Sequence, residues 1–169
     1  MLKIDIFPHI LPTKYKEALH KEMGPGFYQD VHKTMATMLD LDYRFRIMDK
    51  FEGLLHVLTI AGPPVEEVVN PQKAVDLARL ANDEMAELVL KYPDRFAAAV
   101  AWLPLNDMDA ALKETDRTIK DLKFRGVQIY APTMESPPDL PEFLPLYEKM
   151  AQYNLPVWLH PTRPRDYPD

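Results

Sequence analysis

The sequence predicts an α/β protein built as part of a parallel (β/α) barrel, and three observations support this fold. Short apolar runs, typical of strands buried on both faces, alternate along the chain with longer segments of helical periodicity. Each strand–helix unit spans roughly 30 to 45 residues, which is enough for the right-handed crossover that parallel strands need. Many of the 17 prolines stand just after the apolar runs, where loops between strand and helix would begin.

The first strand is expected over residues 4–7, which are β-branched or aromatic apart from Asp5. Pro8 lacks a backbone donor and should end the strand, so His9 is expected just past its carboxyl end. That end is the edge where parallel sheets and barrels bind ligands. The alternative is that His9 only caps a loop by hydrogen bonding to the backbone.

The second strand is expected after two helices. Residues 14–23 form a short amphipathic segment that Gly24 and its neighbours close, and residues 41–51 have helical apolar spacing followed by Gly53. Residues 54–61 are then a second, mainly apolar run, which predicts a buried strand.

The rest of the chain repeats the same alternation. Pro71 opens a long helix, and Asp107 is a suitable N-cap for a later one. Helices are expected over residues 72–92, 108–122 and 141–153, and strands over residues 96–103, 126–131 and 156–160.

The length of the chain and its number of strands indicate only part of a closed barrel. The 169 residues suit one domain, residues 1–169, but a closed eight-stranded barrel needs roughly 200 residues or more. A five-stranded half would leave two unpaired edges. We therefore expect the N-terminal portion of a longer (β/α)8 TIM barrel, or a chain that completes itself by association as a homo-oligomer.

Composition excludes several classes of partner. The net charge is −6 with acids and bases interleaved, so no basic face is expected for nucleic acid. No apolar run approaches the ~20 residues that cross a bilayer, which predicts no membrane partner. Cysteine is absent, so thiolate chemistry is excluded and a cytoplasmic location is expected.

Two of the five histidines point to a metal site. His20 and His32 lie in polar surroundings and are expected to be exposed, and His56 lies near the start of a strand, where a packing role is expected. His9 and His160 both end apolar strands next to a proline, so both should project at the same edge of the sheet. Neutral imidazoles that converge from different strands are typical ligands of Zn²⁺ or Mn²⁺.

An ordered set of short motifs resembles a known family. These are the first strand ending near His9, the pattern MD-x-x-x-G, and the stretches YPDRF, GVQI and PVWLHP. Together they resemble the amidohydrolase superfamily, in its amidohydrolase 2 branch related to aminocarboxymuconate-semialdehyde decarboxylase. The resemblance implies a TIM barrel of the metal-dependent hydrolase type, a divalent metal, zinc or else manganese, and a small carboxylated or acyl substrate.

The resemblance also implies roles for particular residues. His9 matches the second histidine of the family's H-x-H pair and His160 the metal ligand that ends the fifth strand, whereas the first histidine of the pair falls on Phe7, which cannot bind a metal. A later histidine and the aspartate of the eighth strand would follow Asp169. The group that transfers the proton is therefore not assigned.

Substrate contacts are expected from Tyr130, at the end of the fourth strand, and from Arg163, which follows His160 and would attract an anion. The family's carboxylate-binding arginine is not found at its expected place in residues 32–39. Arg44 and Arg46, on the following helix, are interpreted as structural or surface charges.

Two functions are consistent with these features. The first is an amidohydrolase-family enzyme, a decarboxylase or a hydrolase, that acts on a small carboxylated substrate with a divalent metal. The alternative is a catalytically inactive barrel or fragment that serves as a binding or assembly subunit, which the phenylalanine at position 7 favours.

Overall fold

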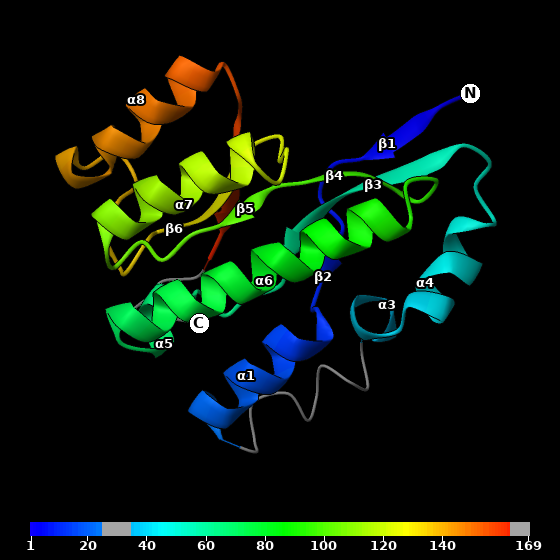
Figure 1. The fold of residues 1–169 in the computed structure, drawn as a ribbon, viewed down its shortest axis with the longest axis horizontal. Coiled ribbons are helices and arrows are strands. Elements are labelled where there is room, and N and C mark those ends of the chain that lie inside the picture. Colours follow the sequence, from blue (N-terminus) through cyan, green and yellow to red (C-terminus); the bar gives the residue numbers. More distant parts are fainter. Residues whose placement is uncertain (25–34, 163–169) are drawn as a thin grey trace.

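The computed structural model describes residues 1–24 and 35–162, in which strands and helices alternate (Figure 1). Five strand positions follow one another in chain order, and the first and third are each split in two. The strands are β1 (Lys3–Asp5), β2 (His9–Ile10), β3 (Leu54–Ile60), β4 (Phe96–Ala99), β5 (Ala101–Trp102), β6 (Val127–Ala131) and β7 (Val157–Pro161). All pairings between them are parallel, which confirms a partial (β/α) barrel.

The first strand position differs from the prediction. Its strand was expected to run to Phe7, with His9 beyond it, but β1 ends at Asp5 and pairing with β3 resumes at His9 in β2. The Asp5 carboxylate accepts a hydrogen bond of 3.0 Å from the backbone N–H of Phe7, which turns the chain between the two strands. Pro8 interrupts the strand rather than ending it, so His9 belongs to the sheet.

The third strand position is split at Val100, but its hydrogen bonding continues across the break. The Val100 N–H donates to Leu58 at 3.0 Å, and the next N–H, of Ala101, donates to Gly126 at 2.9 Å. β4 therefore pairs with β3 on one side, while β5 pairs with β6 on the other. The five strand positions form one continuous curved layer.

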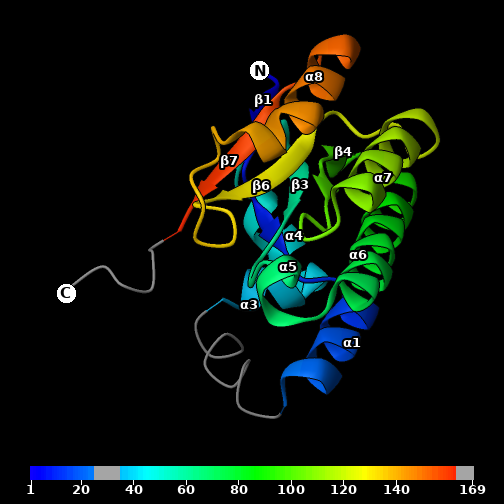
Figure 2. The same ribbon diagram turned by 90° about the vertical axis from the view of Figure 1, so that its left-hand side faces the viewer.

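The helices pack along the strands, and Figure 2 shows α6 and α7 beside each other on one side of the sheet. Those that were predicted are present within one or two turns of the expected ends, and the short α3 and α5 were not predicted. The helices are α1 (Thr13–Met23), α3 (Ala36–Leu39), α4 (Leu41–Met48), α5 (Val65–Val68), α6 (Pro71–Lys91), α7 (Met108–Lys120), the 3-10 turn η1 (Pro141–Phe143) and α8 (Leu144–Tyr153).

The helix ends show both local and distant capping. Asp107 caps α7 as predicted, since its carboxylate accepts from the N–H of Ala110 at 3.0 Å. The first turn of α1 has no side-chain cap of its own. Its donors at Lys14 and Tyr15 instead bond the carboxylate of Glu84 on α6, at 3.0 and 2.6 Å, which fixes α1 against the longest helix.

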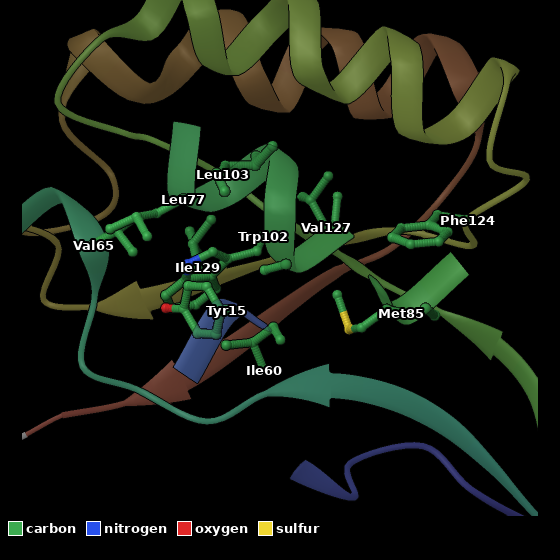
Figure 3. Packing of buried hydrophobic residues seen from close by; sticks show 14 of the residues in the cluster. Tyr15, Ile60, Val65, Leu77, Met85, Trp102, Leu103, Phe124, Val127 and Ile129 are labelled. Carbon is green, nitrogen blue, oxygen red and sulfur yellow. The ribbon is translucent and has the colours of Figure 1, made fainter. Parts of the chain in front are cut away.

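The main hydrophobic core lies between the sheet and the helices (Figure 3). Trp102, Val127 and Ile129 contribute from the strands, and Leu77 and Met85 from α6. A smaller apolar cluster consists of Val57, Ala98 and Val100 with Trp158 packed against it. These four side chains belong to a separate cluster because strand residues alternate between the two faces of the sheet.

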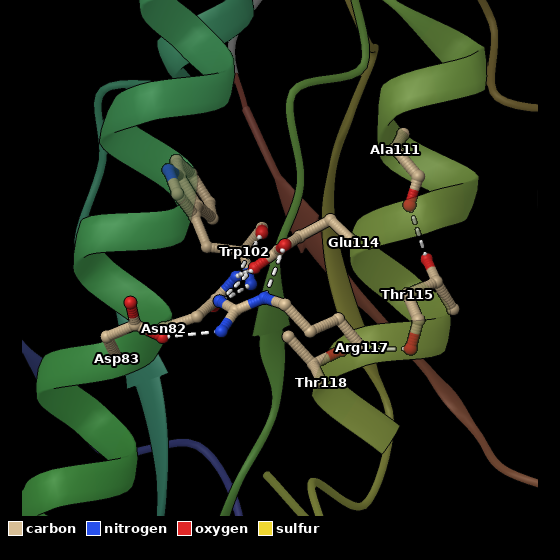
Figure 4. A network of polar contacts seen from close by, with 8 residues as sticks. All are labelled: Asn82, Asp83, Trp102, Ala111, Glu114, Thr115, Arg117 and Thr118. Carbon is tan, nitrogen blue, oxygen red and sulfur yellow. Dashed lines mark hydrogen bonds and ion pairs between the residues drawn. The ribbon is translucent and has the colours of Figure 1, made fainter. Parts of the chain in front are cut away.

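A buried polar network joins α6, α7 and β5 (Figure 4). The Asn82 amide donates to the Trp102 carbonyl at 2.9 Å and accepts from the Trp102 N–H at 2.8 Å. It also donates to the Glu114 carboxylate at 2.7 Å, and Arg117 holds that carboxylate by two further hydrogen bonds. Asp83 accepts from Arg117 at 2.6 Å, nearer the surface.

Within the described residues, the sheet has two free edges, one formed by β1 and β2 and the other by β7. Apolar side chains lie exposed on or beside them: Ile4 is 49% exposed, Ile6 55% and Leu159 54%. This agrees with the expectation that five strands of a barrel leave both edges unpaired. No helix in the described part of the chain has the length and apolar character needed to span a bilayer.

Candidate functional site

The imidazoles of His9 and His160 meet across the curved sheet. Their Nε2 atoms are 3.2 Å apart, although the two residues lie on the first and fifth strand positions. The Trp158 indole N–H also crosses this space and donates to the Ile6 carbonyl at 2.7 Å. The prediction that both histidines lie together at the carboxyl end of the sheet is therefore confirmed. The sheet is curved enough to bring side chains of its first and last strands into contact.

Hydrogen bonds at the other ring nitrogens orient both imidazoles. The Nδ1 of His160 lies 3.0 Å from the Pro161 carbonyl, which can only accept, so Nδ1 carries the hydrogen. A neutral His160 then presents a lone pair at Nε2. The Nδ1 of His9 lies 2.8 Å from the Thr59 hydroxyl, whose oxygen can accept the Nδ1 hydrogen. The Nε2 of His9 then also carries a lone pair, and it faces His160.

The surroundings of His9 keep its imidazole neutral. Its pKa is lowered from 6.5 to about 4, chiefly by burial and in smaller part by the charges of His160 and Arg44. A neutral imidazole is the form that binds a metal. Near neutral pH His9 is therefore in the state that a ligand requires.

We expect this shift to make the stability of the metal-free protein depend on pH. Because the folded pKa of about 4 lies below the unfolded value of 6.5, the contribution of His9 is complete above pH 6.5 and is lost as pH falls towards 4. Urea unfolding of the wild type and of His9→Gln between pH 7.5 and 4.5 measures this contribution. The difference in the free energy of unfolding between the two proteins should shrink as pH falls. A difference that stays constant would contradict the lowered pKa of His9.

Aromatic rings surround the histidine pair. The Phe7 ring centroid lies 5.4 Å from that of His9 and 5.9 Å from that of His160. Tyr130, only 3% exposed, packs against His160 with centroids 4.4 Å apart, and Trp102 packs edge-on against Tyr130. Tyr130 thus lies beside the histidines and is buried among neighbouring rings.

Arg44, interpreted from the sequence as a structural or surface charge, lies behind His9, and this contact was not predicted. It is 3% exposed and donates to the His9 carbonyl, while Arg46 two residues later is exposed. One signal could have identified it, because Arg44 follows Leu41 by three residues and precedes Met48 by four, which places it on the inward helix face. Burial lowers the Arg44 pKa to about 10, so it stays charged at neutral pH.

His56 pairs with Arg44 instead of joining the site. Its Nδ1 lies 3.1 Å from a guanidinium nitrogen that can only donate, so Nδ1 is the acceptor. Burial, and after it the Arg44 charge, lowers the His56 pKa. The packing role expected of His56 agrees with this position.

The histidine pair fits part of a metal site. Two imidazole nitrogens bound to one tetrahedral ion at about 2.0–2.1 Å would be about 3.3 Å apart, close to the 3.2 Å between these Nε2 atoms. Residues 1–24 and 35–162 contain no group of three or more His, Asp or Glu side chains able to hold a metal. They supply two donors where a catalytic zinc site usually has three protein ligands.

One predicted site residue and two histidines expected to be exposed remain. Arg163, expected to contact the substrate, and His32 lie outside the described residues. His20 is exposed on α1, as predicted.

Comparison with known proteins places these observations in a family. The model of a family described as Amidohydrolase matches residues 31–169. The chain is 35% identical over 160 residues to gamma-resorcylate decarboxylase of Rhodococcus jostii, a match that covers 88% of this chain and 48% of that protein. The chain spans about half the length of the curated relatives it matches.

Solved structures agree with this relationship. A crystal structure of 2,6-dihydroxybenzoate decarboxylase in complex with 2,6-dihydroxybenzoate superposes with a TM-score of 0.78 at 32% identity, over 98% of this chain and 52% of that one. A dihydroxybenzoic acid decarboxylase from Polaromonas sp. JS666, with bound manganese and the inhibitor 2-nitroresorcinol, has a TM-score of 0.77 at 29% identity, over 98% and 51% of the two chains.

Proposed function

This chain belongs to the amidohydrolase family, and we propose that the protein is a metal-dependent decarboxylase of a small carboxylated aromatic substrate. The observation that carries the proposal is the 3.2 Å approach of the His9 and His160 Nε2 atoms. Decarboxylases dominate the related proteins, which favours carbon–carbon bond cleavage over hydrolysis.

The proposal gives each site residue a role. His9 and His160 would be ligands of one divalent metal, which when bound would supply a Lewis acid for the substrate's oxygens. Phe7 offers a half-buried flat apolar surface beside them, suited to an aromatic ring. Tyr130 would hold the His160 ring in place and border the substrate, and Arg163 would attract its carboxylate.

The two imidazoles would leave further coordination positions of the metal ion to be filled by other ligands. Related proteins are about twice as long as this chain, so in a whole barrel of this kind further ligands would come from later strands. Manganese is the more plausible metal because a related structure holds it, and zinc is the second candidate. We extend the proposal to a homo-oligomer, as the sequence led us to expect, and to a cytoplasmic location, which the absence of cysteine supports.

One observation favours the alternative of an inactive barrel. By the sequence resemblance, Phe7 falls where the family has its first metal-binding histidine, and its ring lies next to both imidazoles. A subunit that had lost its metal would retain the fold and the histidine pair but bind no ion.

Metal analysis and an activity assay separate the two functions. The protein is stripped of metal, reconstituted with Mn²⁺ or Zn²⁺, and assayed for CO₂ release from 2,6-dihydroxybenzoate, with benzoate as the control substrate. We expect one tightly bound ion and metal-dependent CO₂ release from the dihydroxy acid alone. Protein that binds no ion after reconstitution supports the inactive barrel.

Restoring the missing ligand is expected to strengthen metal binding. The Phe7 ring lies 5.4 and 5.9 Å from the two imidazoles, similar to the 5.0 Å between those imidazoles, so Phe7→His would bring a third imidazole within reach of the same ion. Mn²⁺ affinity measured by calorimetry should rise at least about tenfold. Metal-free stability should fall by roughly 1–3 kcal/mol through loss of apolar contact.

Phe7→Leu is the matched control, because it removes the aromatic ring without adding a ligand. It should lose stability without gaining affinity. Unchanged Mn²⁺ affinity in a folded Phe7→His protein would mean that Phe7 does not occupy the ligand position.

A further inference from the structure

Arg44 joins three separate segments of the chain through its guanidinium group. Its Nε donates to the Thr37 carbonyl at 2.8 Å, Nη1 donates to His56 Nδ1 at 3.1 Å, and Nη2 donates to the His9 carbonyl. The segment before α4 is thereby tied to β3 and to β2. All these partners are neutral acceptors.

A buried cation of this kind is costly unless its donors are needed where they are. Arg44 is 3% exposed, and although the charge of Asp5 favours its charged form, no carboxylate in the described part of the chain lies within ion-pair distance of it. Transfer of a charge out of water without an opposite charge is unfavourable. An apolar side chain would pack α4 against the sheet at a lower cost in free energy. Packing alone therefore does not account for an arginine at this position, and its hydrogen bonds are the feature to be explained.

The His9 carbonyl is the acceptor that most needs such a donor. The carbonyls of Pro8 and Ile10 accept from Thr59 and Ala61, so they point towards β3. Because carbonyls alternate along a strand, that of His9 points away from β3, to the unpaired side of this two-residue strand. Arg44 meets it there.

The sheet holds the backbone of β2 from one side only, through its pairing with β3. Pro8 has no N–H, and the chain leaves the sheet between β1 and β2. The Thr59 hydroxyl fixes the His9 ring at Nδ1, 2.8 Å away, but it cannot fix the backbone from which the ring projects. A rotation of the peptide after His9 would move Nε2 relative to His160.

We propose that Arg44 is a positioning residue for His9, which fixes the His9 carbonyl and so directs the Nε2 atom towards His160. The inference rests on the proposed role of His9 as a metal ligand. Arg44 itself touches neither substrate nor metal. It acts on the site through the backbone, as outer partners of metal-binding histidines generally act through the ring.

The test compares Arg44→Ala with Arg46→Ala, a change on the exposed face of the same helix. Mn²⁺ affinity of the intact protein, measured by calorimetry, should fall by 10- to 100-fold in Arg44→Ala and stay within twofold in Arg46→Ala. Arg44→Lys keeps the charge and the stem but has a single donor group, so it should be intermediate; it also serves if the alanine variant fails to fold.

Two readouts separate positioning from general stabilisation. Arg44 lines an open cavity of about 450 Å³, together with Met48, Phe51 and His56, so free guanidinium can reach its place in Arg44→Ala. We expect low-millimolar guanidinium to restore part of the Mn²⁺ affinity of Arg44→Ala and to leave that of Arg46→Ala unchanged. In metal-free protein, the ¹⁵N resonances of the His9 ring should shift in Arg44→Ala while those of His20 do not.

The outcomes are distinct. Unchanged Mn²⁺ affinity and unchanged His9 resonances in folded Arg44→Ala overturn the inference. Weaker affinity with shifts throughout the protein and no recovery by guanidinium also overturns it, because Arg44 is then only structural. If the wild type binds no Mn²⁺, the proposed function fails, and the His9 resonances alone still decide whether Arg44 directs the ring.

Discussion

Replacing His160 with alanine is expected to lower Mn²⁺ affinity by more than about 100-fold, since loss of an outer partner alone costs 10- to 100-fold. His160 supplies one of the two nitrogens that face each other at 3.2 Å, and no other described histidine lies within reach of that position. CO₂ release from 2,6-dihydroxybenzoate should fall to background at moderate metal concentrations. Calorimetry and the CO₂ assay measure the two effects.

The fold should tolerate this change. His160 is half-buried on the edge strand β7, so its loss should alter the free energy of unfolding by only about 1 kcal/mol. His20→Ala, on the exposed face of α1, is the matched control and should leave both affinity and activity intact. Full Mn²⁺ affinity in folded His160→Ala would exclude His160 as a ligand and remove the main support for the proposed function.

Replacing Asn82 with alanine is expected to destabilise the protein by about 3–5 kcal/mol. The change removes three buried hydrogen bonds, two to the Trp102 backbone and one to Glu114, and no water can easily replace them because Asn82 is completely buried. The Trp102 N–H and carbonyl and part of the Glu114 carboxylate would lose their partner. Urea unfolding monitored by circular dichroism gives the difference, with an unchanged m-value.

Asp83→Ala is a suitable control because it removes the neighbouring residue on the same helix. Asp83 is half exposed, at 50% of its side chain, and pairs with Arg117 at the surface end of the network. Its loss should cost less than about 1 kcal/mol. Equal destabilisation by the two variants would mean that the network is no more than a set of surface ion pairs.

The strands were largely predictable because their signal is local. The β3 and β6 runs are predominantly apolar, and loop signals directly follow both of them, so their positions agree with the prediction within a residue or two. The end of a strand was harder to predict where a proline lies between two paired segments. Pro8 indicated a strand end, but long-range pairing of His9 with Thr59 restores the strand beyond it.

The short helices α3 and α5 were missed for a related reason. Four residues are too few to show a helical period, and such a helix is marginal in isolation. α5 is held from outside, because the Asn106 amide donates to the carbonyls of Glu66 and Val69 at 3.2 Å. The partner lies 40 residues from Glu66, so no local pattern reveals it.

The order of the strands and helices, their parallel arrangement, and the placement of His9 and His160 at the carboxyl end of the sheet could all be predicted from local patterns, because periodicity and loop residues indicate which face and which end each residue occupies. Two contacts became visible in the folded chain alone: the imidazoles, 151 residues apart, approach to 3.2 Å, and Arg44 bonds the His9 carbonyl. Both contacts depend on the curvature of the whole sheet and on packing between distant segments. That curvature results from many pairings together, and no single stretch of sequence contains it.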